Sequence, residues 1–223
     1  MKHTLLLAAF LFAPPLVSAQ EIKLLPSDGA AQDRFGFSVA ISGTTSIVGT
    51  YGHDHNGASS GCAYLFDTTT GTQWAELLPT DGAAGDLFGW SAAIDGSTTV
   101  IGSPNDNGTG GVTQSGSAYL FDAVTGLQIS KITASDAATN DYFGLSVALD
   151  GDTLAVAARH EDSNQTTITN GNSNASGDNS NLSSGGVYVY KRTGTTWAQE
   201  AYIKASNSEA ADNFGSSEYS WIG

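Results

Sequence analysis

Two histidines separated by one residue, His53 and His55, are the side chains best suited to transition-metal chemistry. Asp54 lies between them and adds carboxylate oxygens. Zinc takes three or four protein ligands in a tetrahedral site, and two histidines on a loop supply only half of that number. Two interpretations stay open for Asp54 and its neighbours, a partial metal site or an ordinary polar turn.

A second loop carries oxygen donors suited to calcium, namely Asn105, Asp106 and Asn107. Calcium needs six to eight oxygen ligands. Asn and Asp are also the residues that turns use, because their side chains hydrogen-bond to the nearby backbone. We predict no cofactor, and calcium at these residues is the one ion that the sequence suggests.

No set of nucleophile and base is visible, so we predict that the chain is not an enzyme. The stretch "GASSG" at 57–61 matches the G-x-S-x-G motif, but it leads into a predicted strand rather than a helix, where that motif has no meaning. Cys62 is the single cysteine, which excludes an internal disulfide.

These loops belong to a repeat marked by an Asp-x-Phe-Gly motif. The Phe-Gly pairs are 53, 55 and 71 residues apart, and a period of this size indicates a solenoid or a propeller. We predict that the Asp accepts hydrogen bonds in a turn, that the Phe fills the gap between neighbouring sheets, and that the Gly permits close backbone approach. The motif residues are Asp33, Phe35, Gly36, Asp86, Phe88, Gly89, Asp141, Phe143, Gly144, Asp212, Phe214 and Gly215.

Each repeat contains four apolar segments of strand length, bounded by turn residues. In the first repeat, bulky residues alternate with small ones from Phe35 to Ile41, so both faces of the strand are predicted to be buried. Cys62 falls where the other repeats have Ser117 and Gly186, as a small strand residue would. The predicted fold is all-β, with four-stranded antiparallel propeller blades at about 35–80, 88–134 and 143–205.

The motif, with "SVAI" after it and "AYLFD" in the third segment, resembles the FG-GAP repeat over residues 28–215. The resemblance implies the β-propeller of integrin α-subunits and of secreted bacterial proteins. That family often carries a calcium loop between its first two strands. Here this connection is shortened to "ISGTTS", "IDGSTT" and "LDGDTL", so the chain resembles the bacterial variant without the calcium loop.

The ends of the array do not complete a ring. Residues 21–26 match a fourth strand without its first three, and residues 212–223 form only a stub. In a closed propeller such an orphan strand would complete the final blade. Two explanations stay open: the chain is a fragment of a longer propeller, or partial rings associate between chains through exposed blade faces.

The third repeat is lengthened by a low-complexity stretch at 161–184, predicted to be a loop insert. Residues 1–19 are predicted to be a secretory signal peptide, followed by one propeller domain at 20–223. The protein is therefore expected outside the cell, on its surface or in the periplasm, with no membrane insertion after cleavage.

The formal net charge of −14 argues against nucleic acid as a partner, because that partner requires a basic surface. The sequence favours a secreted or cell-surface binding or adhesion module for a protein or glycan ligand. The alternative is an accessory or catalytic domain of a secreted hydrolase, with active residues on loops or in further blades.

Overall fold

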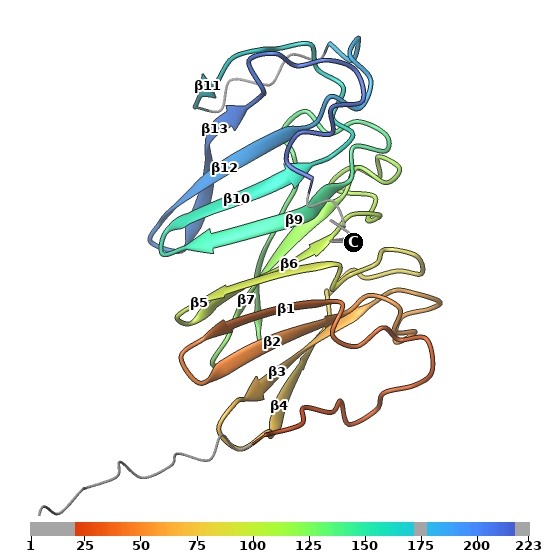
Figure 1. Cartoon of the computed structure of the whole chain (residues 1–223), viewed down its shortest axis with the longest axis vertical. Coiled ribbons are helices and arrows are strands. Elements are labelled where there is room, and N and C mark those ends of the chain that lie inside the picture. Colours follow the sequence, from red (N-terminus) through yellow and green to blue (C-terminus); the bar gives the residue numbers. More distant parts are fainter. Residues whose placement is uncertain (1–20, 172–177, 217–223) are drawn as a thin grey trace, which may run out of the picture.

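The computed structural model describes residues 21–171 and 178–216, and it contains three antiparallel β-sheets stacked along the long axis of the molecule (Figure 1). The predicted signal peptide, part of the predicted insert and the end of the predicted stub fall outside these ranges. Within them, no helix is long and apolar enough to cross a membrane. The prediction of an all-β fold, with three complete four-stranded blades of an incomplete propeller, is confirmed.

Each sheet, or blade, holds the four strands of one repeat in sequence order. The strands of the first two blades are β1 (Ser38–Ser42), β2 (Thr45–Thr50), β3 (Cys62–Asp67), β4 (Gln73–Leu77), β5 (Ser91–Asp95), β6 (Thr98–Ser103), β7 (Ser117–Asp122) and β8 (Gln128–Ile132). The strands of the third blade are β9 (Phe143–Asp150), β10 (Thr153–Ala158), β12 (Gly186–Thr193) and β13 (Thr196–Ile203), with the short β11 (Thr169–Asn170) beside β13.

Neighbouring blades pack the bulky face of one sheet against the small face of the other, as the alternation along the first strand predicted. Between the first two blades, Ile47 and Leu65 lie in one fully buried cluster with Phe88 and Tyr119. The corresponding buried residues between the second and third blades are Val100, Leu120, Phe143 and Tyr188. The core is therefore divided into layers between the blades.

The Asp-x-Phe-Gly motif forms a turn in the first two blades, whereas the sequence predicted that the first strand begins at its phenylalanine. β1 begins at Ser38 and β5 at Ser91, three residues after that phenylalanine. Arg34 and Gly36 have φ angles of 64° and 88°, outside the β region, and the pairing of β1 with β2 begins only at Ser38. Only β9 begins at the motif phenylalanine, Phe143.

The aspartate of each motif accepts a backbone hydrogen bond from the residue three positions before it, as predicted. The four N–H groups are those of Ala30, Ala83, Ala138 and Glu209, at 2.6 to 2.7 Å from the carboxylates. Asp141 is only 2% exposed. Its burial, reinforced by the carboxylates of Glu161 and Asp136, raises the pKa of Asp141 to about 7.

We expect the free energy of unfolding to fall by about 2–4 kcal/mol as the pH rises from 4 to 8, because the folded state holds the Asp141 proton more tightly than the unfolded chain does. The raised pKa stabilises the fold at low pH, and this contribution is lost as the pH rises through about 7. Urea unfolding from pH 4 to 8 should show a flatter profile for Asp141→Asn. The exposed control Asp150→Asn should keep the wild-type profile, and an equally steep profile for Asp141→Asn would contradict the assignment.

The predicted orphan strand at 21–26 is wrong, because no strand forms there. The segment nevertheless contacts the first blade in the same way that β4 and the residues after it contact the second blade. The backbone N–H of Ser27 donates to Gln73 Oε1 at 2.8 Å, and the equivalent N–H of Thr80 donates to Gln128 Oε1 at 2.9 Å. A strand needs a paired neighbour, and this segment has none in the described chain.

The insert at 161–184 connects β10 to β12 as predicted, but its ends are built into the blade. Glu161, Ser163 and Ser184 are at most 3% exposed. The two-residue strand β11 pairs with β13 and widens the third sheet. Composition alone does not predict this anchoring, because the contacts are made by single polar residues within a polar stretch.

Candidate binding site at the loop end of the first blade

A tyrosine in the third strand of each blade donates a hydrogen bond to an aspartate from the segment before that blade. We call the polar side chains around this bond the tyrosine cluster. The three bonds run from Tyr64 to Asp28 (2.8 Å), from Tyr119 to Asp81 (3.0 Å) and from Tyr188 to Asp136 (2.7 Å). The same site therefore exists three times, and its variations can be compared directly.

In the second blade, a lysine supplies a positive charge to the tyrosine cluster. Lys131 Nζ lies 2.7 Å from Asp81 and 2.9 Å from Asp106. Asp106 also accepts hydrogen bonds from Ser117 and Tyr119. Two carboxylates thus share one ammonium group: the buried Asp106 has it as its counter-charge, while Asp81 is 49% exposed and keeps contact with solvent.

In the third blade, a different lysine does the same. Lys204 Nζ lies 2.7 Å from Glu161, and both side chains are buried. Tyr202 donates to the same carboxylate, and Ser184 accepts a hydrogen bond from the ammonium group. Because Lys204 follows β13, whereas Lys131 lies in β8, the cation is retained although its position in the sequence changes.

In the first blade, the tyrosine cluster contains no lysine. His53 occupies the position of Asp106 and Glu161, because the backbone carbonyl of each of the three accepts a hydrogen bond from the N–H of the glycine before the third strand, at 2.8 to 2.9 Å. Glu76 pairs with Tyr64 across the sheet, as Lys131 pairs with Tyr119. Relative to the second blade, the first cluster therefore has His53 in place of Asp106 and Glu76 in place of Lys131.

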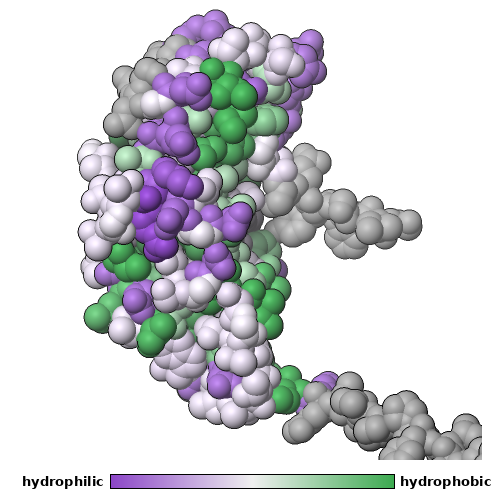
Figure 2. Space-filling model, turned by 90° about the vertical axis from the view of Figure 1, so that its left-hand side faces the viewer, coloured by the Kyte–Doolittle hydropathy of each residue, from purple (hydrophilic) through white to green (hydrophobic). Residues whose placement is uncertain are grey.

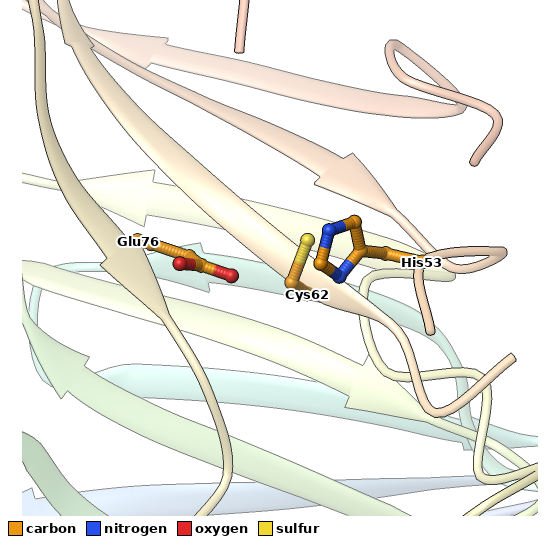
Figure 3. Close-up of side chains that lie close together, drawn as sticks. All are labelled: His53, Cys62 and Glu76. Atoms are coloured by element: carbon orange, nitrogen blue, oxygen red, sulfur yellow. The ribbon is translucent and has the colours of Figure 1, made fainter. Parts of the chain in front are cut away.

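Among the described residues, His53, Cys62 and Glu76 form the one group that could hold a metal ion. One ligand atom from each side chain lies within 4.8 Å of the others. Figure 3 shows the thiol of Cys62 between the imidazole of His53 and the carboxylate of Glu76. His53 comes from the loop after β2, whereas Cys62 begins β3 and Glu76 lies in β4.

The electrostatics of this group reflect its burial. Burial raises the pKa of the Cys62 thiol to about 12, and burial together with the Asp28 carboxylate raises the pKa of Glu76. His53 Nδ1 and Glu76 Oε1 are buried without a hydrogen-bond partner. The nearest base to that oxygen, His55 Nδ1, is 3.6 Å away, which is beyond ordinary hydrogen-bonding distance.

The residues predicted to bind a metal have other partners. Asp106 lies in the ion pair with Lys131, and Asn107 Oδ1 accepts the backbone N–H of Gln114 at 3.1 Å. Asp54 Oδ1 accepts the N–H of Ser59 at 2.7 Å within its own turn. These contacts fit the turn interpretation, while calcium at Asn105, Asp106 and Asn107 stays a prediction.

Sequence reasoning missed Cys62 and Glu76 as neighbours of His53, because the three residues are far apart along the chain. A register comparison could have found them. Aligning the fourth segments places Glu76 at the position that Lys131 holds in the next repeat, so a carboxylate replaces an ammonium group there. A charge reversal at a repeated position is a signal that single-residue motifs do not carry.

The outward face of the first blade exposes large apolar side chains. Val39 and Ile41 of β1 are 67% and 64% exposed, and Leu25 is 59% exposed. At the register of Ile41 in the second blade, Ile94 is only 8% exposed, because the first blade covers it. Figure 2 shows separate apolar patches on one side of the molecule, including its lower half, where the first two blades lie.

Comparison with known proteins gives a family match and likenesses to solved structures. No curated protein matches the chain. Among solved structures, the crystal structure of the computationally designed Ika8 protein resembles it with a TM-score of 0.44 and 10% identity. That alignment covers 78% of this chain and 38% of the design, so the chain spans well under half of the design's length.

The family model described as the FG-GAP repeat matches residues 19–66, 72–121 and 127–190. The second and third matches begin beside the fourth strands β4 and β8 and end in the third strand of the next sheet, so the repeat is offset by one strand from the blade. The matches cover more than half of the sequence, and each includes the first two strands and most of the third main strand of one blade. The chain therefore belongs to the FG-GAP repeat family.

Proposed function

We propose that this FG-GAP protein is a secreted or cell-surface, non-catalytic binding module that associates through the outward face of its first blade. The observation that carries the proposal is the exposure of Ile41, at 64%, against 8% for Ile94 at the same register. A solvent-exposed isoleucine is ordinary by itself, but a repeated core position left open points to a covering partner.

The partner that we propose is a second copy of this chain. Leu24 and the residues around Asp28 already cover the outer strands of the face, through the contact of Leu24 with the first-blade core and the bond from Tyr64. What stays bare is the inner strand β1, with Val39 and Ile41. Two such faces can pack against each other as the two sheets of a β-sandwich do, related by the twofold symmetry that is commonest among oligomers.

The net charge of the chain determines how this association should depend on salt concentration. A formal net charge of −14 repels a second copy at low ionic strength. Salt screens that repulsion and also strengthens apolar contact. We therefore expect dimerisation to become tighter as the sodium chloride concentration rises, which is opposite to the behaviour of an interface held by ion pairs.

The test is light scattering after size-exclusion chromatography, over a range of protein and salt concentrations. The wild-type protein should form a dimer, and Ile41→Lys should weaken dimerisation at least tenfold, because a charged group would enter an apolar contact. Val124→Lys is the matched control, since Val124 is 71% exposed at a turn of the second blade. A wild-type protein that stays monomeric at all concentrations would exclude the second copy as the partner.

A further inference from the structure

The three tyrosine clusters contain two carboxylates each, and only the first lacks a lysine to balance them. The second blade pairs Asp81 and Asp106 with Lys131. The first blade presents Asp28 and Glu76, and the imidazole of His53 lies 3.5 Å from Asp28. Asp28 is 41% exposed, but Glu76 Oε1 is buried without a hydrogen-bond partner. A buried carboxylate oxygen requires a counter-charge or a donor, so this position has room for a cation that the chain itself does not supply as an ammonium group.

We propose that the first blade binds one zinc-class divalent ion through His53, Cys62 and Glu76, at the position where the second blade holds the ammonium group of Lys131. The ion would be structural, tying the loop after β2 to β3 and β4. Asp28 lies within reach as a fourth ligand, which would also fix the segment before the first blade.

The distances suit an ion of this size. Zinc lies about 2.0–2.3 Å from nitrogen, oxygen and sulfur ligands, so the ligand atoms of a tetrahedral site are about 3.3–3.8 Å apart. The atoms of the three side chains lie within 4.8 Å of one another. The group therefore leaves a space slightly larger than the ion, which small side-chain rotations can close (Figure 3).

The unpaired atoms at this position support the proposal independently. His53 is 9% exposed and its Nδ1 has no hydrogen-bond partner, and the same is true of the buried Glu76 Oε1. In the other two blades, the corresponding carboxylates of Asp106 and Glu161 are hydrogen-bonded. Leaving buried polar atoms unpaired is costly, and a bound ion would engage the side chains that carry them.

The ligand types select the metal. Calcium and magnesium prefer oxygen ligands, whereas imidazole and thiolate together favour zinc and its transition-metal neighbours. The competing explanation is that His53 is simply protonated and pairs with Asp28 without any metal. In that case the pocket should show no selective affinity for zinc or cobalt.

The experiment uses the full chain, stripped with a chelator, kept reduced and titrated with Co²⁺ and then Zn²⁺. We expect one Co²⁺ per chain, with the near-ultraviolet absorption of a cobalt–thiolate bond, displacement by Zn²⁺, and a rise in Tm of at least about 4 °C with the bound ion. His160→Asn, in a loop of the third blade, should leave all three results unchanged.

The matched variant converts the first cluster into the second. His53→Asp, Cys62→Ser and Glu76→Lys together reproduce Asp106, Ser117 and Lys131, so this triple variant should fold, and it should bind no Co²⁺. Cys62→Ser alone should lose the cobalt–thiolate absorption. Absence of stoichiometric binding by the wild type, or equal binding by the folded triple variant, would overturn the proposal.

Discussion

Replacing Phe88 with alanine should lower the free energy of unfolding by about 3–5 kcal/mol, which is a large part of the total stability of an ordinary domain. Phe88 is fully buried between the first two blades, with its ring centroid 5.5 Å from that of Tyr119 and 5.8 Å from that of Phe121. The substitution removes these contacts and leaves a cavity that two facing sheets cannot close.

Phe35 offers the matched control, because it holds the same motif position in the first blade. Its ring contacts Tyr64 and Phe66 at 6.0 and 5.9 Å, but no preceding blade covers it and it is only partly buried. Phe35→Ala should therefore cost clearly less than Phe88→Ala. Chemical denaturation of both variants measures the difference, and equal costs would mean that burial between blades does not stabilise the motif.

Gly89→Ala should destabilise the protein by about 3 kcal/mol or more, through a clash that no rotamer can relieve. A Cβ atom on Gly89 would lie 2.7 Å from the backbone nitrogen of Thr50 and closer still to the carbonyl oxygen of Cys62. Both atoms belong to the preceding blade, so the two sheets would have to separate.

Gly36→Ala isolates this clash from backbone strain. Gly36 has a φ of 88° and Gly89 one of 93°, so the two substitutions carry the same conformational penalty of about 1–2 kcal/mol. Nothing lies within 4 Å of a Cβ atom on Gly36. In thermal unfolding, the Tm of Gly36→Ala should be well above the Tm of Gly89→Ala. Similar Tm values would show that backbone strain alone requires the glycine.

The strands and the roles of the motif could be predicted from the sequence, because each depends on residues close together in the chain. The "AYLFD" segment predicted as the third strand of a repeat lies within β3 and β7, and both strands end at its aspartate. The phenylalanine and glycine roles followed from a repeat that places the same residue at every junction between blades.

The start of β1 and the candidate metal group could not be predicted in the same way. Alternation continued through Phe35, but β1 pairs with β2 only from Ser38 onward, and alternation does not report where pairing begins. His53, Cys62 and Glu76 meet only because β2, β3 and β4 are neighbours in one sheet. Such a meeting depends on cross-strand register, which a linear motif does not encode.

The offset of one strand between the sequence repeat and the blade has a consequence for how such proteins change over generations. A duplicated gene segment of one repeat would carry the fourth strand of one sheet and three strands of the next. Inserted in frame, it would add a whole blade, and each repeat would still contribute strands to two neighbouring sheets. The number of blades is thus open to change by unequal recombination, without any intermediate that exposes a half-built sheet.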